Sequence, residues 1–134
     1  ALRRKAEERK ARMTEAIVLF AHGSRDPEWA GPFRALKALV EARRPGARVE
    51  LAFLEQMRPT LDEAIDAAAA GQARRVLVVP LFLAPGGHTK RDVPVLLAAA
   101  RARHPTLEIR ATSSIGEEQD VLAALADWIA RATG

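Results

Sequence analysis

The sequence has no cysteine among its 134 residues. This absence excludes disulfide bonds, thiolate metal sites and cysteine nucleophiles. No apolar run approaches the roughly 20 residues that a helix needs to cross a bilayer, and the basic first residues carry no apolar stretch like that of a secretory signal. The expected location is therefore the cytosol, with no membrane partner.

Excess charge is also missing from most of the chain. Six of the 21 basic residues and two of the 17 acidic ones lie in residues 1–13, so the other residues carry 15 charges of each sign and the net charge of +4 belongs to this arm. A nucleic-acid-binding domain is expected to carry its basic excess on the folded part, which argues against nucleic acid as a partner. The arm has good helix formers but almost no apolar face. It is interpreted as a solvated helix, or as a segment upstream of a natural start at Met13.

The length suits one domain, since domains commonly have about 100–150 residues. Hydrophobic residues make up 49% and charged residues 28% of the sequence, as is typical of a globular protein. A domain of this size buries only about two-thirds of its unfolded surface, so further burial in a dimer would add stability. Residues 14–134 are expected to form that single domain.

Strands and helices are predicted to alternate along this domain. Continuous apolar runs, typical of parallel strands buried on both faces, predict strands at residues 16–21, 47–54, 75–83 and 107–112. Apolar residues at helical spacing predict helices at 27–43, 59–70, about 92–103 and 118–132. Val121, Leu125, Trp128 and Ile129 of the last helix are expected to face the core. This order predicts a doubly wound α/β fold, with a mainly parallel four-stranded sheet, right-handed crossovers and helices on both faces.

Prolines refine these boundaries. Pro59 suits the first turn of the second helix, before Gly71 as its C-terminal cap. Pro80 marks either a bulge or the point where pairing of the third strand stops, because proline cannot donate to a sheet ladder. Asp92 followed by Pro94 predicts an N-cap with proline in the first turn of the third helix.

Groups able to bind a metal ion or move a proton follow three of the predicted strands. His22 follows the first, Glu55 the second, and His88 lies in the loop after the third. Ligands bind beyond the carboxyl ends of the strands in such sheets, so these side chains are expected to converge. Two imidazoles and a carboxylate suit cobalt, iron, nickel or zinc and leave coordination positions open for a further ligand. The same groups can also accept protons from a substrate.

Each of these residues also has a purely structural interpretation. A histidine at a strand end can simply hydrogen-bond its own loop. Glu55 can cap the helix that starts near Pro59, because acidic groups favour helix N-termini. His104, at the end of a predicted helix, is interpreted as a surface residue favoured by the helix dipole.

Polar and basic residues near the same edge are expected either to bind an anionic substrate or to be ordinary solvated side chains. Arginine binds carboxylates through bidentate pairs, hydroxyl groups add hydrogen bonds or caps, and glycine lets a ligand approach the backbone. The candidate substrate-binding residues are Ser24, Arg25, Arg58, Gly87, Thr89, Lys90 and Arg91.

Three motifs, in their order and spacing, resemble the small sirohydrochlorin chelatases, which are the CbiX-type class II cobaltochelatases. They are AHGSRDP after the first strand, FLE after the second and PLFLAPGGHTKRDVP after the third, and the resemblance runs from Ala16 to Gly134. Val93 stands where the family more usually has isoleucine, and residues 1–13 fall outside the pattern.

The resemblance implies a chelatase-like fold and insertion of Co²⁺ or Fe²⁺ into sirohydrochlorin, for cobalamin or siroheme synthesis, with no cofactor beyond the substrate metal. The family's metal-handling histidines correspond to His22 and His88, and the acidic partner of related chelatases corresponds to Glu55. Larger relatives place the site between two lobes of one chain. A single lobe therefore implies a homodimer that encloses the tetrapyrrole.

Two other functions remain as alternatives. Histidine phosphatases also place a His-Gly pair after their first strand, but they need an arginine directly before that histidine, and here the position is Ala21. A metal carrier or sensor would use the same ligands without binding a macrocycle. The ligand set accepts cobalt, iron and nickel alike, and the sequence leaves open whether a dimer has one working site or two.

Overall fold

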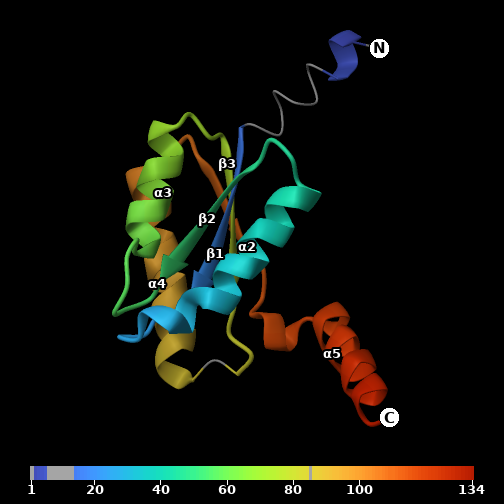
Figure 1. Cartoon of the computed structure of the whole chain (residues 1–134). Coiled ribbons are helices and arrows are strands. Elements are labelled where there is room, and N and C mark those ends of the chain that lie inside the picture. The colour runs from blue at the N-terminus through green and yellow to red at the C-terminus, as the bar shows by residue number, and fades with distance from the viewer. Residues whose placement is uncertain (1, 6–13, 85) are drawn as a thin grey trace.

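The computed structural model of the chain describes residues 2–5, 14–84 and 86–134, and residues 2–5 are helical (Figure 1). The rest of the predicted basic arm lies outside the described residues. The elements after Thr14 are β1 (Glu15–Ala21), η1 (Pro27–Ala30), α2 (Gly31–Arg43), β2 (Arg48–Phe53), α3 (Leu61–Ala70), β3 (Arg75–Pro80), α4 (Gly87–Arg103), β4 (Glu108–Ala111), η2 (Ile115–Glu117) and α5 (Gln119–Ala132).

The four strands form one parallel sheet in the order β2-β1-β3-β4. This arrangement confirms the predicted α/β fold with its parallel four-stranded sheet. The chain leaves β1 for β2 on one side and then crosses back to β3 on the other side. The carboxyl ends of β1 and β3 therefore flank the point where the strand order reverses, which is where open α/β sheets bind their ligands.

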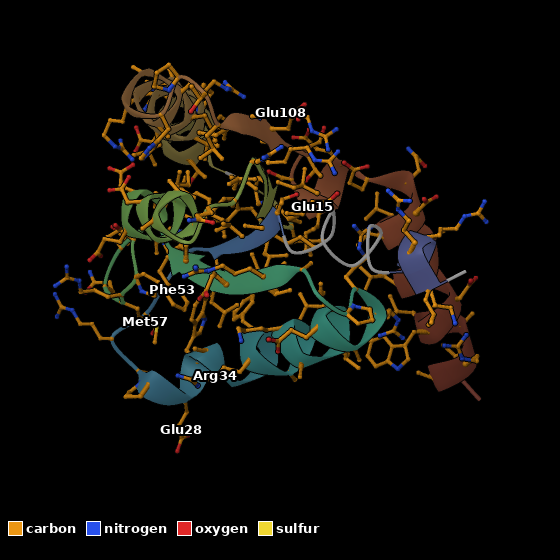
Figure 2. All side chains as sticks on the ribbon, turned by 90° about the horizontal axis from the view of Figure 1, so that it is seen from above. Glu15, Glu28, Arg34, Phe53, Met57 and Glu108 are labelled. Carbon is orange, nitrogen blue, oxygen red and sulfur yellow. The ribbon has the colours of Figure 1, made fainter. Side chains whose placement is uncertain are left out.

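Helices cover the two faces of the sheet, as Figure 2 shows from above. On one face α3 and α4 pack on the sheet, with Phe20, Val78 and Ile65 in a fully buried core. On the other face a smaller cluster joins Phe53 at the end of β2 to Phe33 of α2. Successive strand residues point to opposite faces of the sheet, and both faces are apolar. The strands therefore appear in the sequence as continuous apolar runs.

Two helices begin later than predicted. The helix expected at 27–43 is a 3₁₀ turn, η1, followed by α2, because Pro32 has no N–H to continue the first ladder and instead suits the first turn of a new helix. The helix expected from Pro59 begins at Leu61. Thr60 is its N-cap: the Thr60 hydroxyl accepts from Glu63 N at 3.2 Å, and the Glu63 carboxylate accepts from Thr60 N at 3.0 Å.

Pro80 is the last residue of β3, so the strand is shorter than the predicted 75–83. Of the two alternatives for Pro80, the structure therefore shows the end of the regular strand, with one further backbone bond from Leu81 N to Phe20 O. The third long helix begins earlier than predicted, at Gly87, with Gly86 in an extended conformation as its N-cap. The predicted N-cap at Asp92 is therefore wrong. Asp92 and Pro94 lie inside α4, where Pro94 lacks the N–H that would bond to the carbonyl of Lys90.

The expectation that the last helix packs its apolar face into the core is also wrong. Leu125, Trp128 and Ile129 are 38%, 60% and 54% exposed. Figure 1 shows α5 leading away from the sheet instead of returning to cover it. Among the residues that the structure describes, no helix is both long enough and apolar enough to cross a membrane.

Candidate functional site

The three loops that carry the candidate metal ligands leave the same edge of the sheet. Backbone pairing continues past the strand ends: Leu54 N donates to Ala21 O at 2.9 Å, and Glu55 N donates to His22 O at 3.1 Å. On the other side of β1, Leu81 N donates to Phe20 O at 2.7 Å. The loops after β2 and β3 are thus fixed against the end of β1, where His22 lies.

His22 and Glu55, predicted to converge, lie within hydrogen-bond distance of each other. His22 Nε2 is 3.0 Å from Glu55 Oε1, and the two side chains are 51% and 52% exposed. Both groups are therefore open to solvent and to an incoming ion. Glu55 does not cap α3, because Thr60 and Glu63 form that cap. The structural alternative for Glu55 is wrong.

Gly23 makes this pairing possible. Its φ is +99°, a conformation that favours glycine. A Cβ at this position would lie 1.8 Å from the carbonyl oxygen of Glu55, which is far inside contact distance. The absent side chain of Gly23 therefore lets the loops after β1 and β2 close on each other.

The ring of Phe82 packs against the imidazole of His22. The two rings are 6.4 Å apart at an angle of 84°, an edge-to-face arrangement, and Phe82 is itself 7% exposed. Phe82 also packs edge-to-face on Phe20 in the core, with ring centres 5.6 Å apart. The imidazole of His22 therefore packs against Phe82, which is itself held in place by Phe20. Sequence reasoning missed both Gly23 and Phe82, although both lie inside the quoted motifs.

His88 lies in the first turn of α4, which starts at the same edge. Its side chain lies outside what the structure describes. Among the described side chains no group of three or more His, Asp or Glu residues is close enough to hold a metal ion. His22 and Glu55 therefore make up the described part of the predicted ligand set.

The start of α4 has an unusual charge pattern for a helix N-terminus. Its first turn has no acidic residue, and Lys90 and the following Arg91 are both exposed. Cations are unfavourable near the positive end of the helix dipole, whereas anions are favoured there. This end of α4 is therefore suited to an anionic ligand. Gly87 is exposed as well, and a Cβ there would meet no atom within 4 Å.

Thr89, by contrast, is 6% exposed, so it is packed within the protein and presents little surface to a substrate. Ser24 accepts from Asp26 N at 3.1 Å, and Asp26 in turn caps η1. Arg25 donates from Nε to Gln56 Oε1 at 3.2 Å, which links the loops after β1 and β2. Ser24 and Arg25 thus both stabilise the loop that follows His22.

Arg58 is engaged elsewhere. Its guanidinium makes two hydrogen bonds to the carboxylate of Glu63, the one from Nε measuring 3.0 Å. Hydrogen bonds from Arg58 and from the Thr60 backbone lower the pKa of Glu63 to about 2. Arg58 therefore stabilises the start of α3, an arrangement that the sequence interpretation of Arg58 did not anticipate.

A cavity of about 390 Å³ lies next to the site, between α2 and the end of β2. Phe53 and Met57, which Figure 2 labels at the same end of the sheet, form its apolar wall, and Arg34 and Lys37 of α2 line the opposite side. Neither His22 nor Glu55 lines it. The cavity is therefore separate from the position where these two side chains meet.

Known proteins are similar to this chain in sequence and in fold. The sequence model of the CbiX family matches residues 16–132. The sirohydrochlorin cobaltochelatase of Methanopyrus kandleri is 42% identical over 82 residues, which are 61% of this chain and 57% of that protein. The aligned residues span 57% to 63% of three such curated relatives.

Two solved structures resemble the chain as well. One is a protein from Marinobacter aquaeolei described as a cobalamin (vitamin B12) biosynthesis CbiX protein; it is 30% identical with a TM-score of 0.77, over 89% of this chain and 97% of that one. The other is the sirohydrochlorin chelatase SirB from Bacillus subtilis subspecies spizizenii in complex with cobalt, 29% identical with a TM-score of 0.73, over 87% of this chain and 50% of SirB. The motifs, the fold and the matched residues together show that this chain belongs to the CbiX family.

Proposed function

We propose that the chain inserts Co²⁺ or Fe²⁺ into sirohydrochlorin, a polycarboxylated tetrapyrrole of cobalamin and siroheme synthesis. The observation that carries the proposal is the solvent-exposed pair of His22 and Glu55 at the carboxyl edge of the sheet. The comparisons support it, since a relative from M. kandleri is a sirohydrochlorin cobaltochelatase and SirB is a sirohydrochlorin chelatase whose crystal structure contains cobalt.

The spacing of the pair fits two ligands of one ion. Nitrogen and oxygen ligands bind such ions at about 2.1 Å, so two ligands at a right angle lie about 3 Å apart. The observed distance from His22 Nε2 to Glu55 Oε1 is 3.0 Å. A divalent ion can therefore replace the shared proton with little movement of either side chain, and His88 supplies the third ligand from α4. Because the metal competes with protons for the imidazoles, insertion falls at acid pH.

Insertion then exchanges ligands on the substrate ion. The pyrrole nitrogens replace its water molecules, and two N–H protons must leave the macrocycle as the metal enters. Glu55 and the imidazoles are bases that can accept them once the ion has moved. The carboxylates of the substrate bind at the basic start of α4, where Lys90 and Arg91 are exposed. Arg25 is hydrogen-bonded to Gln56 of the loop after β2.

A flat macrocycle needs a wall on each side. The aligned region covers 87% of this chain but half of SirB, which supports the expectation that larger relatives have two such lobes where this chain has one. We therefore propose that the functional unit is a homodimer, with the tetrapyrrole held between the carboxyl edges of two copies.

The test is metal insertion measured by the change in the absorbance spectrum of sirohydrochlorin. The wild-type chain with Co²⁺ is expected to convert the spectrum, and the His22→Ala and His88→Ala variants are expected to lose that activity while keeping the wild-type circular dichroism spectrum. A chain that binds cobalt but leaves the sirohydrochlorin spectrum unchanged is a carrier or sensor, and that result would overturn the proposal.

A further inference from the structure

The cavity of about 390 Å³ between α2 and the end of β2 has the size of a small-molecule site, since such sites commonly measure about 300–1,000 Å³. Neither His22 nor Glu55 lines it, so metal binding by this pair does not use it. One wall of the cavity is apolar and the other is charged. The chemistry of the two walls indicates what the cavity can bind.

The apolar wall is held in place by the core. Leu51 and Phe53 of β2 form it together with Met57 and Pro59 of the segment that follows the strand. Phe53 is 4% exposed, and Leu51 and Met57 pack on the same buried cluster. Phe53 N donates to Pro59 O at 2.9 Å, which folds this segment back against the end of the strand. A ligand with an apolar body therefore meets a preformed surface.

The charged wall leaves Arg34 of α2 unpaired. Each of the other charged residues that line the cavity has a partner of opposite charge: Lys37 with Glu41, Arg58 with Glu63, and Glu50 with Arg48. Arg34 is exposed and makes no hydrogen bond or ion pair with any residue that the structure describes. Figure 2 labels Arg34 at the same end of the sheet as Phe53 and Met57. The described lining thus carries one uncompensated positive charge beside an apolar surface.

We propose that the cavity is a second binding site of the chain, and that its ligand is a small monocarboxylate with an apolar body. The guanidinium of Arg34 binds the carboxylate through two parallel hydrogen bonds, and the apolar body lies against Phe53 and Met57. A dianion such as inorganic phosphate is a poorer match, because its second charge is repelled by Glu41 and Glu50 of the same lining. The inference goes beyond metal insertion and does not depend on it.

Trp29 provides a signal for occupancy of the cavity. The chain has two tryptophans. Trp29 packs on the same cluster as Leu51 and Met57, which line the cavity, whereas Trp128 is 60% exposed on α5. In the Trp128→Phe variant the tryptophan fluorescence therefore comes from Trp29 alone.

The test is titration of this variant with phenylacetate, a monocarboxylate with an apolar ring, and with phenylacetamide, which has the same shape without the charge. Phenylacetate is expected to change the Trp29 fluorescence in a saturable way. Phenylacetamide is expected to bind about 10–100-fold more weakly, because it loses a hydrogen-bonded ion pair with Arg34. Isothermal titration of the wild-type chain with the same two compounds checks both affinities.

Arg34→Met is expected to weaken phenylacetate binding by the same factor and to remove the preference for the acid over the amide. Arg43→Met is the matched control, because Arg43 lies on the same helix but outside the lining, and it is expected to keep the wild-type affinity. Three results would each overturn the proposal: no binding of phenylacetate, equal binding of acid and amide, or wild-type affinity in Arg34→Met. Inorganic phosphate that binds as tightly as phenylacetate overturns the ligand class.

The insertion assay separates this inference from the proposed function. A chain that binds phenylacetate through Arg34 but leaves sirohydrochlorin unchanged removes the chelatase proposal and supports the second site. A chain that converts sirohydrochlorin but does not bind phenylacetate overturns the second site alone. Competition distinguishes a free acid from a carboxylate arm of the tetrapyrrole. If sirohydrochlorin displaces phenylacetate, the cavity belongs to the tetrapyrrole site, and the proposal of a separate ligand is overturned.

Discussion

The Cα of Gly23 lies against the backbone of Glu55, so closely that a Cβ at Gly23 would be 1.8 Å from the Glu55 carbonyl oxygen. This contact explains how two residues 33 positions apart, His22 and Glu55, come to share a hydrogen bond. The loops after β1 and β2 can approach only because one of them has no side chain at the crossing. The geometry of the candidate metal ligands therefore depends on a residue that is not itself a ligand.

Gly23→Ala is expected to separate His22 from Glu55 and to destabilise the fold. The added methyl group clashes with backbone, and φ at this position is unfavourable for alanine, so we expect the free energy of unfolding to fall by about 2–4 kcal/mol. Urea unfolding measures this loss, and the absorbance assay is expected to show loss of insertion. Gly31→Ala is the control, because a Cβ there meets nothing within 4 Å. A Gly23→Ala variant as stable and active as Gly31→Ala contradicts the argument.

Glu55→Gln tests the carboxylate itself. The amide keeps the shape of the side chain but removes its charge, so a divalent ion loses an anionic ligand and the pyrrole protons lose an acceptor. We expect cobalt affinity to fall by about 10–100-fold, and insertion to fall with it. Isothermal titration with Co²⁺ measures the affinity. Glu117→Gln, an exposed acidic residue of η2, serves as the matched control, and an equal affinity in the two variants would show that Glu55 does not bind the ion.

The ion pair of Arg58 and Glu63 predicts how stability changes with pH. The pKa of Glu63 is lowered from 4.5 to about 2, first by the hydrogen bonds from Arg58 and then by the bond from the Thr60 backbone. A lowered pKa in the folded state means that the carboxylate stabilises the fold above its ordinary pKa, and that this contribution is lost as pH falls toward the folded-state value. The melting temperature of Glu63→Gln is therefore expected to lie below that of the wild type at pH 7. The difference in melting temperature between Glu63→Gln and the wild type is expected to shrink between pH 4.5 and 2. A constant difference across this range would mean that the ion pair of Arg58 and Glu63 does not cause the change of stability with pH.

The sequence predicted the sheet and the convergence of His22 and Glu55 because both follow from strong local patterns. Four apolar runs separated by helical segments define parallel strands, and parallel strands bring the residues that follow them to one edge. The capping box of α3 was also readable, since Thr60 followed by Glu63 is the pattern of such a cap. Pro59 also suits a first helical turn, however, so the predicted helix starts two residues before the observed one at Leu61.

Other features depend on information that a local pattern does not contain. Asp92 and Pro94 resemble a helix start, yet α4 begins at Gly87, because a glycine with extended backbone already provides the N-cap. The contact of Gly23 with Glu55 depends on the register of two loops. Helical periodicity predicts the apolar face of α5, but periodicity alone does not say whether that face meets the core of its own chain or another surface.

The structure divides the basic residues near the site into two groups. Lys90 and Arg91 are exposed at the start of α4, where their charge is unfavourable to the helix dipole, whereas Arg58 is paired with Glu63. The Lys90→Ala, Arg91→Ala double variant is expected to lose about 1–2 kcal/mol of substrate binding, which corresponds to a rise of about 5–30-fold in the KM for sirohydrochlorin. Arg58→Ala is expected to lower the melting temperature and leave KM unchanged. Steady-state kinetics at low and high salt measure the KM of both variants. The rise in KM of the double variant is expected to be smaller at high salt, because ions screen exposed charges. If Arg58→Ala raises KM as much as the double variant does, the substrate carboxylates bind on the side of β2 instead, next to the cavity that Arg34 and Lys37 line.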